Sequence, residues 1–259
     1  MPKRYSVSSV VLYLLFLAGI AVAQNAPLDL DKYQSVEGFV DTWWDEDTGR
    51  MLVRVEKFDT PFIYQTSLPR GVGSNDIGLD RGQLGTTKIV RFLRSGPKIL
   101  LVEDNLQYRA DSENARERRA IDESFARSVI WGFVDIDDDY DSTIIDATAF
   151  FVRDAHGVGA RLAMMGEGSF NVDDSRSAIF LPRTKAFPDN TEVEALVTLV
   201  GTPTGQHLRS VMPDRNALTV HVHHSFIRLP DDNYEPLPYE PRSGVIGLRY
   251  DDGGFLDYA

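Results

Sequence analysis

Two histidines in a short apolar segment are the strongest candidates for chemistry in this sequence. His221 and His223 are one residue apart, and side chains alternate along a strand, so a strand here would carry both imidazoles on one face and His224 on the other. Two imidazoles on one face can bind zinc or another divalent metal if a third ligand joins them. The alternative is a pair of structural histidines held by hydrogen bonds. We take His221 and His223 as candidate metal ligands.

A run of acidic residues offers a second possible cation site. Asp135–Asp141 and Asp146 put carboxylates at the first, third, fifth, seventh and twelfth positions of a calcium loop. However, Tyr140 occupies the sixth position, where that loop needs glycine for its sharp turn, and no helical pattern flanks the run. The simpler interpretation is a charged hairpin tip between two strands.

Other patterns carry less weight or exclude an activity. The glycine-rich segment Gly71–Gly78 lacks the lysine of a phosphate-binding loop, so its glycines more simply serve turns. Asp174–Ser177 could contribute to a hydrolase triad, but the chain has no Gly-x-Ser-x-Gly nucleophile elbow. The chain has no cysteine, which excludes disulfides, thiolate zinc sites and cysteine nucleophiles. It has no His-Glu-x-x-His, so it cannot build a zincin active site. We therefore assign no catalytic residue and no cofactor to this chain.

The amino terminus has the pattern of a secretory signal peptide, residues 1–23. Lys3 and Arg4 form a basic start, residues 10–20 are almost purely apolar, and residues 21–23 are a small-x-small cleavage site. The apolar run is shorter than the ~20 residues that span a bilayer. The alternative is an uncleaved anchor. We expect a secreted or periplasmic protein of the cell envelope, with no membrane span after signal cleavage.

The charge of the chain limits its partners. Removal of residues 1–23 takes two basic residues and no acid, so the formal net charge of −12 becomes −14. Such a surface repels phosphate backbones, and we expect no nucleic acid partner. Without disulfides, the fold depends on a hydrophobic core, which suits a bacterial envelope protein.

Most of the remaining chain has the pattern of short strands separated by turns. Two apolar runs across Arg94–Pro97 predict a hairpin, and residues 192–200 alternate as a half-buried strand does. One helix is expected within residues 112–127, with Ser112 as its N-cap. Further strands are expected at residues 51–55, 61–65, 88–93, 98–102, 129–134, 143–152, 218–227 and 244–250. The predicted fold is α+β and β-rich, with antiparallel sheets and hairpins and one or two short helices, over residues 36–259 after a polar lead-in at 24–35.

Seven phrases follow one another along the chain in a recognisable order. They are GLDRGQ (78–83), VEDNLQYRA (102–110), IDAT (145–148), SRS (175–177), AFPDNTEVE (186–194), HHSFIRLP (223–230) and PRSG (241–244). In this order and spacing they resemble the N-terminal, non-catalytic region of large secreted bacterial zinc-dependent, metzincin-like metalloproteases. The resemblance covers roughly residues 36 to 257.

The resemblance implies a β-rich region that precedes a catalytic domain. In such proteases the zinc ligands and the catalytic glutamate lie in a His-Glu-x-x-His segment downstream of the matched region, so no catalytic residue can be transferred to this chain. Zinc is expected in the missing catalytic domain, and we expect the sequence to be truncated before it. The implied partners are the downstream protease domain and a peptide or protein substrate.

Several roles remain open for such a region. It could be an inhibitory or chaperone-like pro-region that blocks the zinc with a carboxylate, for example from the acidic Asp135–Asp141 tip. It could be an attached docking module that uses aromatic side chains such as Trp43 and Trp44, although paired tryptophans near a strand are more often core. The alternatives from other classes are a free-standing envelope binding protein on a β scaffold and a small metal-binding protein that uses His221 and His223.

Overall fold

The computed structural model describes residues 28–108, 110, 112–139, 142–231, 233 and 242. The predicted signal peptide, residues 1–23, and the predicted strand at residues 244–250 lie outside the described residues. Within the described part of the chain, no helix combines the length and apolar character needed to cross a bilayer.

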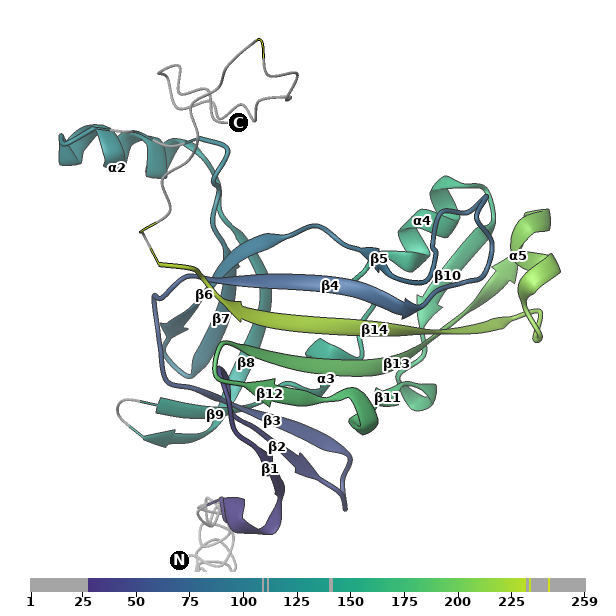
Figure 1. The fold of residues 1–259 in the computed structure, drawn as a ribbon, viewed down its shortest axis with the longest axis horizontal. Coiled ribbons are helices and arrows are strands. Elements are labelled where there is room, and N and C mark those ends of the chain that lie inside the picture. The colour runs from purple at the N-terminus through teal and green to yellow at the C-terminus, as the bar shows by residue number, and fades with distance from the viewer. Residues whose placement is uncertain are drawn as a thin grey trace, which may run out of the picture.

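Fourteen strands of the described residues form one sheet in which every named pair is antiparallel, which confirms the predicted β-rich α+β class (Figure 1). Its main path runs β1-β2-β3-β9-β8-β7-β6-β4-β14-β13-β10, with β5 beside β4 and both β11 and β12 beside β13. The strands are β1 (Gln34–Val36), β2 (Thr42–Asp45), β3 (Arg50–Val55), β4 (Phe62–Arg70), β5 (Gln83–Leu84), β6 (Lys88–Ser95), β7 (Lys98–Glu103), β8 (Ser128–Asp139), β9 (Ser142–Asp146), β10 (Gly168–Val172), β11 (Ala178–Ile179), β12 (Lys185–Phe187), β13 (Asn190–Pro203) and β14 (Ala217–Arg228).

The sheet curls until its two ends meet, which makes the fold a near-barrel. The link between β1 and β2 lies against β12 and β13: the Phe39 amide donates to the Phe187 carbonyl at 2.8 Å. Thr191 Oγ1 accepts from the Val40 amide at 3.0 Å and donates to the Val40 carbonyl at 2.8 Å. These bonds satisfy backbone groups that an open sheet edge would leave unpaired.

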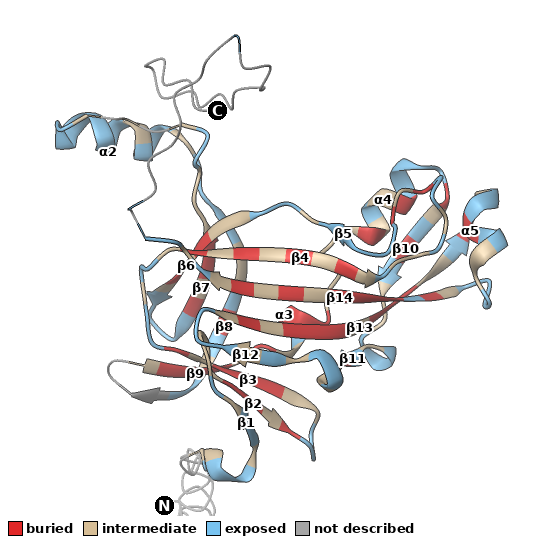
Figure 2. Cartoon of the chain, in the orientation of Figure 1, coloured by how far each residue is buried: buried red, intermediate tan, exposed pale blue. Residues whose placement is uncertain are grey.

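The longest strand pair forms the wall against which the core packs. β13 and β14 pair from Asn190–Ile227 to Val200–Ala217. As the alternation predicted, Val193, Ala195 and Val197 are buried on one face of β13. Buried and partly exposed positions also alternate along β4 (Figure 2).

Aromatic rings fill the interior of the near-barrel. Phe150 is buried and its ring centroid lies 5.5–5.6 Å from those of Tyr64 and Phe133 and 5.3 Å from that of Phe151. Phe226 reaches the same cluster from β14, with its centroid 5.6 Å from that of Tyr64. Contacts at this spacing add to the stability that burial of the rings provides.

The described residues contain four short α-helices, where one or two were expected. They are α2 (Ala115–Ser124), α3 (Thr148–Phe151), α4 (Val158–Met164) and α5 (Gln206–Val211), with 3-10 turns η1 (Leu30–Lys32), η2 (Asp174–Arg176) and η3 (Leu181–Arg183). The predicted N-cap was wrong: Asn114, not Ser112, accepts from the Arg116 amide and starts α2.

The predicted strand at 143–152 was wrong beyond Asp146. Asp146 Oδ1 accepts hydrogen bonds from the Thr148 amide at 2.9 Å and from its hydroxyl at 2.6 Å. This local turn ends β9 and starts α3, which carries Phe150 and Phe151 into the core.

The amino-terminal end of the described chain packs against the fold. Leu28, Leu30 and Tyr33 cover Trp43, Leu52 and Ile144, so the described part of the predicted lead-in contributes apolar contacts. Trp43 is buried and stacks with the Arg54 guanidinium at 4.7 Å from its ring centroid. It therefore serves packing and is not an exposed docking aromatic.

Truncation of Phe150 tests the aromatic core. We expect Phe150→Ala to lower the free energy of unfolding by about 3–5 kcal/mol, because it leaves a cavity among the surrounding aromatic rings. Urea denaturation of residues 24–259 would measure the loss. The control is Phe187→Ala, whose side chain is 47% exposed and should change stability by about 0.5 kcal/mol or less. Equal losses in the two variants would contradict this account of the core.

Candidate functional site

The two predicted metal ligands lie on one face of β14, as their spacing required. The neighbouring strand β13 sets Glu194 directly opposite His223. His221 Nδ1 lies 2.6 Å from Glu194 Oε1, and His223 Nε2 lies 2.7 Å from Glu192 Oε2. Each histidine is therefore paired with a carboxylate of β13. We call these four residues the His–Glu cluster.

The two glutamates set the charge of His223 against the effect of burial. Glu194 and His221 are buried, and Glu192 and His223 are mostly so. Burial by itself would lower the pKa of His223, but its hydrogen bond to Glu192 and the charges of Glu192 and Glu194 outweigh burial and raise that pKa. The same contact, with bonds from Ser225 and Asn190, lowers the pKa of Glu192 against the opposing effect of burial.

A protonated His223 explains the one open contact of the cluster. His223 Nδ1 and Glu194 Oε2 are both buried without a hydrogen bond among the described residues, yet they lie 3.4 Å apart, within ion-pair distance. When His223 carries a proton on each nitrogen, both face a carboxylate, one on Glu192 and one on Glu194. The cluster then joins β13 to β14 by charge as well as by backbone hydrogen bonds.

The contacts of the His–Glu cluster support the structural alternative for the two histidines. Nδ1 of His221 and Nε2 of His223 face different glutamates, so these two nitrogens join β14 to β13 and are not directed at one point. In the part of the chain that is described, no three His, Cys, Asp or Glu side chains are arranged to hold a metal. The geometry favours the structural alternative for His221 and His223.

His224 points to the opposite face and lies in the core. Its Nε2 lies 2.9 Å from the Phe151 carbonyl, which can only accept, so Nε2 carries the proton. Nδ1 therefore accepts from the Tyr64 hydroxyl at 2.8 Å. Burial, aided by the charge of Arg153, lowers the pKa of His224 to about 3, and burial raises that of Tyr64. A neutral His224 thus ties β14 to β4 and α3.

The other sequence candidates form turns and hairpins in the structure. Asp135 and Asp137 belong to β8, which pairs with β9 as a hairpin, and residues 140 and 141 are not described. Gly73 and Gly78 have positive φ angles of 92° and 70°, which supports the turn interpretation of that loop. The hydroxyl of Ser175 bonds to Asp173 Oδ1 within a local 3-10 turn.

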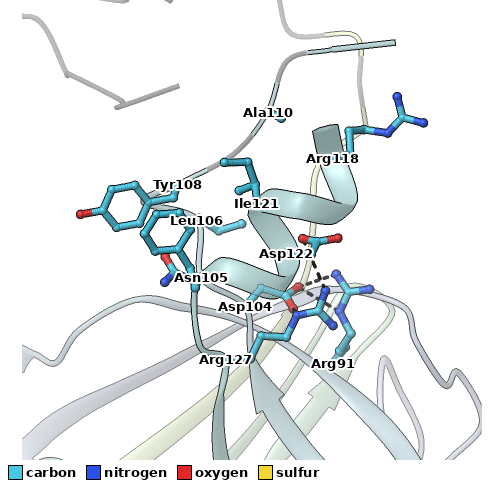
Figure 3. A pocket seen from close by; sticks show the side chains of 11 residues that line it. Arg91, Asp104, Asn105, Leu106, Tyr108, Ala110, Arg118, Ile121, Asp122 and Arg127 are labelled. Carbon is cyan, nitrogen blue, oxygen red and sulfur yellow. Dashed lines mark hydrogen bonds and ion pairs between the residues drawn. The ribbon is translucent and has the colours of Figure 1, made fainter. Parts of the chain in front are cut away.

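The projecting arm between β7 and β8 carries a small cavity. This arm includes α2, which buries none of its residues and extends away from the near-barrel (Figure 1). Tyr108 stacks on Phe125 with ring centroids 3.9 Å apart. Asp104 lies between Arg91 and Arg127 at the base of the cavity, which measures about 230 Å³ (Figure 3). These ion pairs occupy the charged groups that a ligand would use.

A larger cavity opens at one end of the near-barrel, and we call it the mouth cavity. It measures about 410 Å³, a size common among ligand sites. Its apolar lining includes Phe39, Phe62 and Phe92, and charged side chains also contribute to the lining. Sequence reasoning missed it because its residues come from separate strands and loops. Its only sequence signal is the apolar alternation of β4 and β6.

Comparison with known proteins gives a family without a described function. The family described as a domain of unknown function, DUF5117, matches residues 82–252, which is more than half of the chain. The chain belongs to the DUF5117 family. No curated protein and no solved structure matches it.

The folded unit of this DUF5117 protein is larger than the matched residues. The match begins at residue 82, but β4 (Phe62–Arg70) lies in the sheet between β6 and β14. β3 (Arg50–Val55) likewise pairs with β9. Residues 28–81 therefore supply interior strands of the fold.

Truncation to the matched DUF5117 residues tests this boundary. We expect residues 82–252 to be unfolded or aggregated, because loss of β4 exposes one edge of β14 and one of β6 together with core side chains. Residues 28–252 should instead unfold cooperatively. Circular dichroism and urea denaturation of the two chains would measure the difference. A cooperative transition in residues 82–252 would contradict the assignment of β3 and β4 to the same folded unit.

The pH dependence of stability tests the His–Glu cluster. The pKa of His223 is raised on folding, so its contribution is full below the unfolded pKa of about 6.5 and is lost as pH rises through the folded value. We expect His223→Gln to cost about 1–3 kcal/mol at pH 5.5 and clearly less at pH 9. Urea denaturation of both proteins at each pH would show this.

The matched control for this experiment is His207→Gln. His207 is 53% exposed and lies 3.3 Å from Asp76, itself 71% exposed. Its effect on stability should be small at both pH values, because exposed ion pairs contribute little. A pH-independent loss in His223→Gln would mean that His223 is not the titrating group.

Proposed function

We propose that this chain is the accessory, non-catalytic region of a secreted zinc-dependent metalloprotease. The observation that carries the proposal is the order and spacing of the seven phrases, and the pairing of His221 and His223 with Glu194 and Glu192 is consistent with it. That pairing gives the histidines a structural role and leaves the near-barrel as a scaffold beside the chemistry of another domain. The resemblance of the seven ordered phrases supports the identity of that other domain.

Two of these phrases form one region of the near-barrel. Residues 186–194 and 223–230 pair through β13 and β14, from Asn190–Ile227 onward. Arg228 adds a side-chain bond to Asp189 at 2.8 Å and a backbone bond to its carbonyl at 2.9 Å. Segments that are far apart in the sequence thus build a single end of the fold, beside the mouth cavity.

The docking role is better supported than an inhibitory one. The mouth cavity offers an apolar recess on a stable frame, which suits recognition of a peptide or protein. An inhibitory pro-region would need a carboxylate held ready for the zinc. The carboxylates of the His–Glu cluster are turned to histidines and are mostly buried, and the exposed Asp137 of the acidic tip belongs to a hairpin and lines neither of the two cavities described above. We therefore propose that this accessory region stays attached and binds substrate or the protease domain.

A free-standing envelope binding protein is the second candidate. The same mouth cavity favours it, since a binding scaffold needs no protease domain. The two candidates differ in what the intact natural protein contains, because only the first carries zinc chemistry in the same polypeptide.

Isolation of the natural protein tests the proposed function. An antibody raised against residues 24–259 would capture it from the envelope or medium of its source cells. We expect a polypeptide longer than 259 residues that contains about one zinc per chain and hydrolyses protein substrates until the metal is chelated. Residues 24–259 alone should show neither stoichiometric zinc nor hydrolysis.

Two results would contradict the proposal in different ways. A natural protein that ends at Ala259 and lacks zinc would favour the free-standing binding protein. Stoichiometric zinc on residues 24–259 that is lost in His221→Ala or His223→Ala would favour a metal site in this chain. If residues 24–259 inhibit the separate protease domain in trans and are cleaved from it, the role is that of a pro-region.

A further inference from the structure

The mouth cavity lies where β4 begins and β14 ends. β6 pairs with β4 only from Val90–Phe62 to Lys88–Tyr64. Beyond that point Phe92 bonds to the preceding loop, where its carbonyl accepts from the Asp59 amide at 2.9 Å. The lining comes from the link between β1 and β2, the end of β3, the loop before β4 and residues 228–230, with Phe92 from β6.

Aromatic rings form a rigid apolar floor. Phe62 and Phe92 are buried, with ring centroids 5.4 Å apart. Phe39 packs edge-on against Phe62 at 6.0 Å. Buried rings of this kind are held in place by the core, so the floor is preformed for an apolar side chain.

Cations surround this floor in a strongly acidic protein. Arg54, Lys57 and Arg228 line the cavity with only two acids, whereas the chain carries a net charge of −12. Arg54 makes long ion pairs, 3.5 Å to Asp41 and 3.6 Å to Glu56, and no ion pair involves Lys57 among the described residues. Arg228 is in turn paired with Asp189 at 2.8 Å, so Lys57 is the cation of this lining that can attract an anionic group without breaking an ion pair seen among the described residues.

The guanidinium of Arg228 is fixed above the floor. It lies 5.1 Å from the centroid of the Phe39 ring and 2.8 Å from Asp189 Oδ1. This arrangement sets a cation beside an aromatic surface, so an apolar group and a negative charge can be bound by the same ligand. Asp41 and Glu56 add acceptors at the same site for N–H donors.

We propose that the mouth cavity binds the carboxy-terminal residue of a peptide whose last side chain is aromatic or branched aliphatic. The side chain would enter between Phe39, Phe62 and Phe92. The terminal carboxylate would lie among Lys57, Arg54 and Arg228, and backbone N–H groups would face Asp41 or Glu56. A peptide fits better than a simple apolar acid, which lacks the N–H donors that these carboxylates can accept. The proposal goes beyond the accessory function and does not require a protease domain.

Peptide titration of residues 24–259 tests the proposal. The probes are acetyl-Gly-Gly-Phe with a free carboxylate, the same peptide with a carboxy-terminal amide, and 3-phenylpropionate. Isothermal titration calorimetry should show one site for the free peptide, with an affinity at least about tenfold higher than for the amide, because the amide loses the charge. 3-Phenylpropionate should also bind at least about tenfold more weakly, because it lacks N–H donors.

Two variants and a control locate the site. Lys57→Glu reverses an exposed cation at the cavity and should weaken binding of the free peptide by about tenfold or more. Thr60→Trp should block the cavity, since Thr60 is an exposed residue of its lining. Arg215→Glu makes the same charge change before the other end of β14 and should leave affinity within about twofold. Thermal unfolding of each variant would check that the fold is intact.

Several outcomes would overturn the proposal. Equal affinity for the free peptide and its amide would remove the role of the carboxylate. Equal weakening by Lys57→Glu and Arg215→Glu would indicate attraction by overall charge and no defined site. Equal affinity for 3-phenylpropionate would assign the cavity to small apolar acids instead of peptides, and absence of binding by the folded wild-type chain would remove the site altogether.

Discussion

The pairing of β13 with β14 is the interaction on which the rest of the structure depends. β14 also holds β4, and β13 also holds β10, β11 and β12, so this one pair joins both halves of the sheet. One face of the pair carries the apolar residues of the core, and the other carries the His–Glu cluster. The same two strands end beside the mouth cavity, where Arg228 lies over Phe39. Core, buried charge and candidate binding site therefore share one frame.

Local patterns in the sequence predicted the strands well but not their order. The alternation of Val193, Ala195 and Val197 identified β13, because a half-buried strand shows itself in its own residues. The insertion of β4 between β6 and β14 left no such trace, since it depends on pairing between distant segments. The error after Asp146 has a local cause: the side-chain bond to Thr148 turns an apolar, β-branched stretch into a helix.

In the candidate site, too, the local arrangement was predictable from the sequence and the contacts between distant segments were not. Strand alternation was enough to predict that His221 and His223 share a face and that His224 faces away. It could not predict the partners, because Glu192 and Glu194 meet the histidines only through the register of β13 against β14. A histidine pair has the same spacing whether it waits for a metal or already faces two carboxylates. The mouth cavity could not be predicted from the sequence, because its rings come together only when the sheet curls.

The position of β4 has a consequence for how the chain is made. Tyr64 pairs with Phe226, and the Tyr64 hydroxyl bonds to His224. The centre of the sheet therefore cannot form without residues near the far end of the described chain. During synthesis the early strands β1–β4 emerge long before β14, with their apolar faces uncovered. Such long-range pairing slows folding and lengthens exposure to aggregation. The sheet can therefore be completed only late in synthesis, after β14 has emerged.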